Sequence, residues 1–147
     1  MFRIFNVIKD EFMYNTRDYL VDNSGGLNIK FGSLLLGCDP NLLIKTDYTG
    51  VNDTLSGQRI YVGDYVVGID EVNSKMNIVG EVKFVDGSYR VANEVTGTFM
   101  YLHALTHNVA IFGNRFESSE VLKNIDYRKE DLALDLFEEL CYTSLVL

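Results

Sequence analysis

The pair Asp86-Gly87 is the feature that most restricts the fold of this chain. It stands between residues 78–84 and residues 89–91, two runs in which apolar side chains alternate with other residues. Alternation of this kind predicts strands with one buried face. Asp-Gly favours the type I′ turn that joins two antiparallel strands. The sequence therefore predicts a β-hairpin in the second half of the chain.

Much of the remaining chain has the same character. Short β-rich runs alternate with turns rich in Gly, Asp, Asn and Ser, and no repeat, low-complexity run or flexible linker interrupts them. The predicted strands are residues 2–8, 11–14, 19–21, 27–31, 42–46, 59–61, 65–69 and 109–112. The pattern is ambiguous for the Leu run at residues 34–36. Residues 99–107 fit either a short helix or an irregular crossover.

The last part of the chain has a different period. Apolar residues at helical spacing predict an amphipathic helix over residues 124–141, beginning at an Asn124 or Asp126 cap. The apolar positions are Leu132, Leu136, Phe137 and Leu140. This apolar stripe has two alternative partners, the β domain of its own chain or a second subunit.

Residues 49–66 carry a recognisable signature of turns around a short strand. The residues concerned are Thr49-Gly50, Gly57, Ile60-Tyr61 and Gly63-Asp64. With matching blocks at residues 2–14, 80–87 and 111–122, this order resembles the YopX-like family of phage and prophage proteins. The resemblance implies an SH3-like barrel and a phage setting. It implies no chemistry, because the family has no established activity.

Together, these patterns predict a mainly β fold: a small SH3-like β-roll or barrel with packed N-terminal strands and one C-terminal α-helix. We expect a YopX-like β domain over residues 1–122, with N-terminal strands in residues 1–48 and the barrel in residues 49–122. Residues 123–147 form the added amphipathic helix. A chain of 147 residues is long enough to bury a core without disulfides or metal.

Charge and hydropathy narrow the class of partner and the location. The net charge is −8, from 13 basic and 21 acidic side chains. Acidic side chains outnumber basic ones in each of the three segments 1–48, 49–122 and 123–147. Nucleic-acid affinity needs clustered Lys and Arg, so nucleic-acid binding is disfavoured. No apolar run is long enough to span a bilayer, and no signal peptide pattern is found. We therefore expect no membrane association and a location in the host cytoplasm.

Aromatic residues supply the candidate binding site. Tyr61, Asp64, Tyr65 and Tyr89 are predicted to form a contact face on the barrel. A row of aromatic side chains on such a roll can hold a peptide or stack the bases of a single strand. The acidic composition favours a peptide. The alternative role for these aromatics is a structural one, in the core and on the strand faces.

Evidence for catalysis is weak. His103 and His107 have the i, i+4 spacing of a metal pair, but no third ligand is close in the sequence. Asp53, Asp64 and Asp86 fall in turns, where Asp commonly binds its own backbone. No nucleophile motif is found. We therefore expect no enzyme, metal or cofactor, while an enzyme built from these histidines and aspartates remains a third hypothesis.

The leading functional hypothesis is a non-enzymatic phage or prophage accessory protein, a protein-binding or assembly module with a host or phage protein as partner. The alternative is a nucleic-acid-associated factor in phage replication or regulation. That alternative requires a basic patch assembled from Arg59, Lys75, Lys83 and Arg90. We also expect a homo-oligomer, because the terminal helix and the open strand edges favour self-association.

Overall fold

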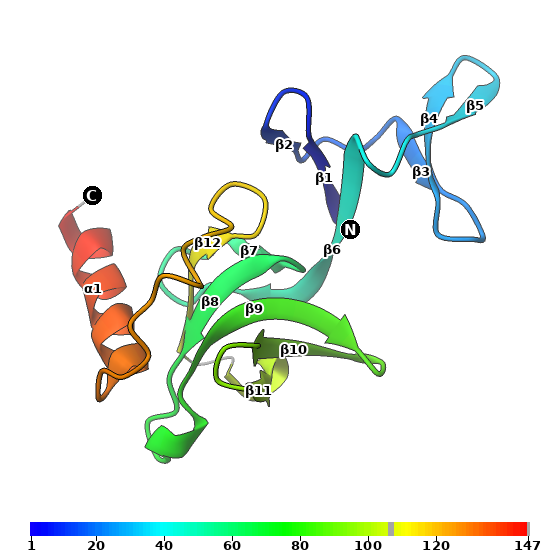
Figure 1. Ribbon diagram of the computed structural model, residues 1–147. Coiled ribbons are helices and arrows are strands. Elements are labelled where there is room, and N and C mark those ends of the chain that lie inside the picture. The colour runs from blue at the N-terminus through cyan, green and yellow to red at the C-terminus, as the bar shows by residue number, and fades with distance from the viewer. Residues whose placement is uncertain (106–107, 147) are drawn as a thin grey trace. The chain divides into compact units, whose positions relative to one another are not determined.

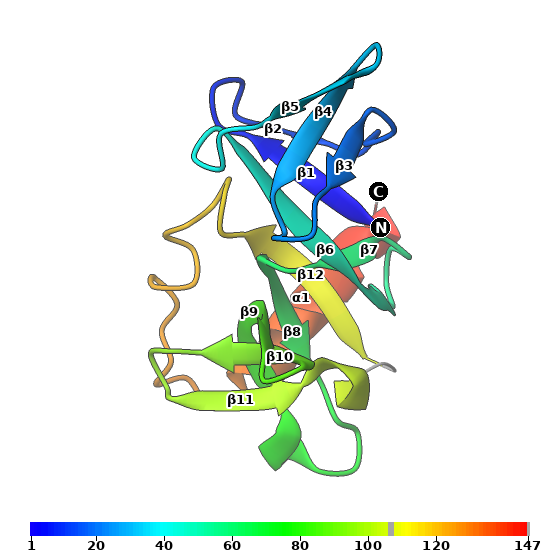
Figure 2. The ribbon, with the colours of Figure 1, turned by 90° about the vertical axis from the view of Figure 1, so that its right-hand side faces the viewer.

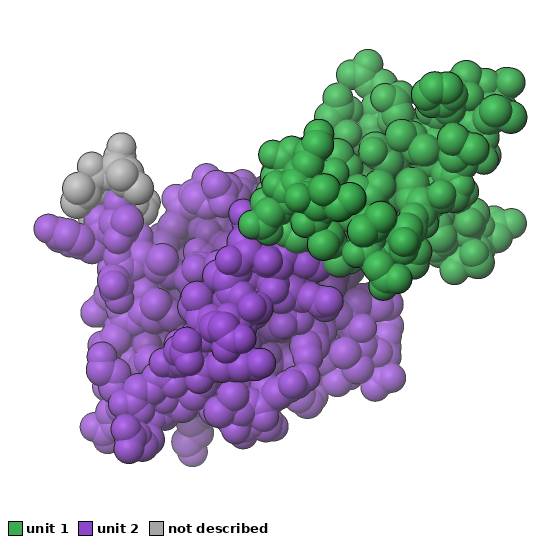
Figure 3. Space-filling model, turned by 45° about the horizontal axis from the view of Figure 1, so that its top comes forward, with its two compact units in different colours: residues 1–48 green, residues 49–147 purple. Residues whose placement is uncertain are grey.

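The computed structural model describes residues 1–105 and 108–146, and it is mainly β with one C-terminal α-helix, as predicted (Figures 1 and 2). The chain forms two compact units, unit 1 (residues 1–48) and unit 2 (residues 49–147) (Figure 3). The boundary between the units falls inside strand β6 (Leu43–Asn52). None of the helices in these described segments is long and apolar enough to cross a membrane.

Unit 1 contains two sets of antiparallel strands. Its strands are β1 (Phe2–Asn6), β2 (Glu11–Met13), β3 (Tyr19–Val21), β4 (Leu27–Phe31), β5 (Leu34–Gly37) and the first part of β6. Strand β1 pairs with β2 on one side and with β6 on the other. Strands β3, β4 and β5 form a separate three-stranded sheet, called the small sheet below.

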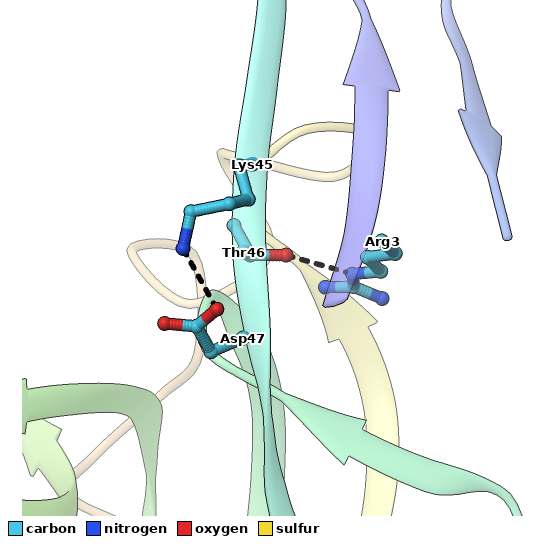
Figure 4. A network of polar contacts seen from close by, with 4 residues as sticks. All are labelled: Arg3, Lys45, Thr46 and Asp47. Atoms are coloured by element: carbon cyan, nitrogen blue, oxygen red, sulfur yellow. Dashed lines mark hydrogen bonds and ion pairs between the residues drawn. The ribbon is translucent and has the colours of Figure 1, made fainter. Parts of the chain in front are cut away.

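The pairing of β1 with β6 includes a buried arginine (Figure 4). Arg3 lies opposite Thr46, and its Nε donates a hydrogen bond of 3.1 Å to the Thr46 hydroxyl. The Arg3 guanidinium also lies 4.0 Å from the centre of the Phe12 ring, a cation–π contact with the neighbouring strand. On β6, Lys45 Nζ and Asp47 Oδ1 form an ion pair at 2.8 Å. The two contacts of Arg3 therefore link β1 to β6 and to β2 through side chains, whereas the ion pair lies within β6.

Unit 2 is built on a curled five-stranded antiparallel sheet in the order β11-β10-β9-β8-β12 (Figure 1). Its strands are β8 (Asp64–Gly68), β9 (Ile78–Val85), β10 (Ser88–Asn93), β11 (Thr98–Tyr101) and β12 (Val109–Asn114). Strand β7 (Arg59–Tyr61) lies next to β6 in the other sheet. The remaining elements are the 3₁₀ turns η1 (Ser74–Met76) and η2 (Leu102–Leu105) and the helix α1 (Leu132–Val146).

The five-stranded sheet is covered on both faces. Its inner face contributes Val66, Val82 and Val91 to a core that Leu102 and Leu105 of η2 close. The residues that alternate with these along the strands point to the outer face. There, Val67 and Val79 contribute to a second core under α1. Both ribbon views place α1 along β8 and β12 (Figures 1 and 2). The sheet therefore separates two hydrophobic layers within unit 2.

The predicted turn and strand patterns are largely present. Asp86 and Gly87 have φ angles of 49° and 78°, the two positive values that a type I′ turn requires. The ambiguous Leu run at residues 34–36 lies within β5. For residues 99–107 the sequence predicted a short helix or an irregular crossover, whereas residues 98–105 form β11 and then the 3₁₀ turn η2. Residues 106–107 of that prediction lie outside the described residues.

The predicted start of the C-terminal helix was wrong. The helix begins at Leu132 rather than near Asn124, and turns occupy the intervening residues. Asp126 accepts hydrogen bonds from the backbone and the side chain of Arg128, which closes a local turn. Asp131 has a φ of 54°, a left-handed conformation that does not continue into a right-handed helix. The apolar stripe of α1 packs on the sheet of its own chain. Of the two predicted partners, the β domain of the same chain and a second subunit, the structure shows the first.

We predict that Phe137→Ala destabilises unit 2 by about 3–5 kcal/mol. Phe137 is the buried residue of α1 in the outer core, so its truncation leaves a cavity between helix and sheet. Chemical denaturation followed by circular dichroism measures the loss. The exposed neighbour provides the control, because Glu138→Ala is expected to change stability by less than about 0.5 kcal/mol. Equal effects of the two substitutions would contradict the observed packing of α1.

Candidate functional site

The four residues predicted as a contact face occupy different environments. Tyr61, Asp64 and Tyr65 are buried, and Tyr89 is half-buried. Asp64 accepts a hydrogen bond of 2.8 Å from the Tyr61 backbone N–H across the turn between β7 and β8. Tyr65 pairs with Glu81 whereas Tyr89 pairs with Phe84, which places the two tyrosines on opposite faces of the sheet. These residues therefore do not form one exposed contact face.

Tyr65 lies beside a small cavity of about 150 Å³ on the outer face of the sheet. Glu81, Lys83, Glu94 and Lys123 contribute its charged side chains. Burial raises the pKa of Tyr65, and burial also raises the pKa of Glu81. The lining contains equal numbers of acidic and basic groups, so it favours neither anions nor cations. The cavity is also smaller than the roughly 300–1,000 Å³ of ordinary ligand pockets.

Two of the four residues of the predicted basic patch are neighbours. Lys83 and Arg90 are cross-strand partners on β9 and β10. Each already has an acidic partner: Lys83 Nζ lies 2.7 Å from Glu94, and Arg90 Nη2 lies 3.9 Å from Asp86. The other two, Lys75 in η1 and Arg59 in β7, come from different elements. This arrangement does not concentrate positive charge as a phosphate-binding surface does.

The histidines and aspartates of the third, enzymatic hypothesis make contacts that are typical of structural residues. His103 is exposed and its ring meets Tyr89 edge-on at 6.4 Å, while His107 lies outside the described residues. Asp53 accepts hydrogen bonds from the backbone N–H groups of Leu55 and Ser56, and from that of Ile111 on β12. Residues 1–105 and 108–146 contain no group of three or more His, Cys, Asp and Glu that could hold a metal ion.

The small sheet has an apolar face. The register of its three strands places seven apolar side chains on one side, because cross-strand partners share a face and alternate residues return to it. The members are Tyr19, Val21, Leu27, Ile29, Phe31, Leu34 and Leu36. We call this set the apolar face. It contains no charged side chain.

Most of the apolar face is open to solvent. The exposed fraction is 70% for Phe31, 61% for Leu34, 49% for Leu36 and 42% for Val21. Only Leu27 is buried, at 9%. Single exposed apolar residues are common on protein surfaces, whereas the exposed side chains of this face adjoin one another on one side of a sheet. The apolar face is therefore the candidate functional site.

Polar contacts hold the turn beside the apolar face. Asp22, between β3 and β4, accepts hydrogen bonds from the backbone N–H groups of Ser24 and Gly26 and from the side chains of Ser24 and Asn28. The Ser24 hydroxyl and then the Asn28 amide lower the pKa of Asp22 to about 2. The ionised carboxylate supports this turn at neutral pH, and that support is lost as the pH falls through about 2.

The sequence contains two partial signals for the apolar face. Alternation in residues 27–31 predicts a half-buried strand, whereas the pattern of the Leu run at 34–36 is ambiguous. Once residues 34–37 are a strand that pairs with β4, Leu34 and Leu36 join Phe31 and Ile29 on one side. What no sequence pattern states is that the chain leaves this side largely uncovered.

The fold is similar to that of a protein of known structure. The crystal structure of protein YopX from Bacillus subtilis aligns with 85% of this chain and 97% of its own, with a TM-score of 0.56 and 16% identity. Protein EF1440 from Enterococcus faecalis aligns with 82% of this chain and 96% of its own, with a TM-score of 0.45 and 17% identity. No family model and no curated protein matches the sequence. The resemblance to the YopX-like family is thus confirmed at the level of fold.

We predict that Glu81→Gln stabilises the protein near pH 7 and has little effect near pH 4. Burial raises the pKa of Glu81, so the folded state prefers the protonated carboxyl. Stability is therefore lost as the pH rises through that raised pKa, and the neutral amide removes the loss. Thermal unfolding of both proteins at the two pH values measures the effect.

Glu94→Gln is the matched control for this prediction. Its carboxylate faces Lys83, and the hydrogen bond from Lys83 lowers the pKa of Glu94. Removing that charge is expected to destabilise the protein slightly at pH 7, the opposite sign to Glu81→Gln. Two shifts of the same sign would contradict the assigned surroundings of Glu81.

Proposed function

We propose that this protein is a non-enzymatic protein-binding module that works through the apolar face of its small sheet. The occupant of the face is an apolar, uncharged protein surface. The observation that carries the proposal is the set of four side chains, Val21, Phe31, Leu34 and Leu36, that stand exposed on one side of three paired strands.

The chemistry of the face supports a protein partner over other ligands. The seven side chains of the face are apolar and present no cation that could bind phosphate. An antiparallel sheet commonly has one face packed and one face solvated. In the small sheet the opposite side carries Asn28 and Lys30 beside Leu20 and Leu35, so only the apolar side lacks charged and amide side chains.

The fold supports the biological setting that we propose. The resemblance of the sequence to phage and prophage proteins and the similarity of the fold to YopX agree with each other. We therefore propose an accessory role for a phage or prophage, carried out in the host cytoplasm. The acidic and basic side chains of unit 2 serve the fold and its surface, with no catalytic part in this proposal.

A photo-crosslinking amino acid at position 34 tests the proposed contact. We expect covalent adducts with protein in cells that make the protein from a phage or prophage background, because position 34 lies on the apolar face. Mass spectrometry of the adducts identifies the protein that is bound. Position 35 is the matched control, since Leu35 is similarly exposed, at 57%, but lies on the opposite side of the same strand.

Adducts at position 34 and few at position 35 would support the proposed face. Equal yields at both positions, or no adduct at position 34, would reject it. Identification of nucleic acid rather than protein in the adduct at position 34 would overturn the proposal in favour of the nucleic-acid alternative.

A further inference from the structure

We infer that the apolar face is covered by the same face of a second copy of this chain, in a two-fold arrangement of two small sheets packed face to face. This inference rests on the proposed function and names the partner of that site. It requires that the face be compatible with itself in shape, in charge and in area.

The face has the shape that a two-fold contact needs. The side chains are large at one end, where Phe31 pairs with Leu34, and smaller at the other, where Leu27 pairs with Val21. With the strands of the two copies running in opposite directions, the large end of each sheet lies over the smaller end of the other. Stacked sheets pack about 10 Å apart with interdigitating side chains. Leu27 is already buried within one chain, so the exposed side chains Val21, Phe31, Leu34 and Leu36 make most of this contact.

Charge permits two copies to meet at unit 1. Residues 1–48 contain five basic and six acidic side chains, whereas residues 49–147 contain eight basic and 15 acidic side chains. Unit 1 is therefore close to neutral, and the negative charge of the chain is concentrated in unit 2. Because like charges repel, self-association is least opposed at unit 1. A basic partner protein would be attracted to unit 2 instead.

The area of the face sets the expected strength. The three strands have three, five and four residues, so the projected area of the sheet is at most about 250 Å², from a strand spacing of about 4.8 Å and a rise of about 3.4 Å per residue. A standard interface buries about 800 Å² on each partner. The contact is therefore expected to be weak and to depend on protein concentration within the micromolar range.

Association through this face would also order the small sheet. An isolated sheet of a few short strands needs packing on one face for stability. Only Leu27 of the apolar face is buried within the single chain. The second copy supplies the missing layer, so the backbone hydrogen bonds of β4 and β5 should open less often in the dimer. The inner and outer cores of unit 2 are already complete and should not respond.

Sedimentation equilibrium of the purified full-length protein tests the inference. Over about 1–500 µM the average mass is expected to rise from the 16.7 kDa of one chain toward twice that value. Leu34→Lys should remain a single chain over the whole range, because it places a charge in each apolar face. Leu35→Lys, on the opposite side of β5, should associate like the unchanged protein.

Hydrogen exchange provides a second readout in the same samples. We expect the amides of β4 and β5 to exchange about tenfold more slowly at the highest concentration than at the lowest, with those of β9 and β10 unchanged. This measurement also shows whether Leu34→Lys keeps unit 2 folded. If Leu34→Lys unfolds unit 2, the variant Phe31→Ser is used instead to test the apolar face.

The outcomes separate this inference from the proposed function. A protein that stays a single chain up to about 500 µM, while position 34 crosslinks to a different protein, overturns the second copy and keeps the binding face. Self-association that Leu35→Lys disrupts as strongly as Leu34→Lys overturns the face-to-face arrangement. A single chain with no adduct at position 34 overturns both proposals.

Discussion

The fold of unit 2 depends on strands that are buried on both faces. All five residues of β8 are buried, with Val66 in the inner core and Val67 in the outer core. This arrangement is stable only if each face has its own cover, because a strand that is apolar on both sides otherwise exposes one of them. Residues of η2 close the inner side, and α1 closes the outer side. The C-terminal helix is therefore a structural requirement of the sheet rather than an addition to it.

The small sheet of unit 1 lacks the corresponding cover. Its strands have three to five residues, against four to eight in the five-stranded sheet of unit 2. Its turns are well defined, since Asp22 fixes one turn and Gly32, with a φ of 63°, lies in the other. Local sequence therefore stabilises the two turns that join its strands. Packing does not stabilise the apolar face, because Phe31, Leu34 and Leu36 meet solvent rather than a second layer. The difference between the two sheets is the physical basis for assigning function to unit 1.

Local patterns predicted the elements of this protein better than its site. The Asp86-Gly87 turn and the mainly β character followed from turn chemistry and alternation, which act over a few residues. The start of α1 did not, because the left-handed Asp131 and the turn at Asp126 override a helical spacing that looks continuous. Tyr61, Asp64 and Tyr65 were predicted at a surface, yet aromatic alternation carries no information about which face a distant helix or turn will cover. Burial of these residues is a property of the tertiary structure alone.

The same reasoning explains why the sequence does not predict the exposure of the apolar face. Alternation identifies an apolar side of a strand, and the ordinary expectation is that the chain buries that side. A chain that binds through such a side must leave it uncovered, so the relevant signal is a missing contact rather than a motif. In the small sheet that absence coincides with a nearly neutral unit and with the lack of any charged residue on the face. Apolar packing is the one favourable interaction that this combination offers to a partner, and a partner with the same surface satisfies it on both sides at once.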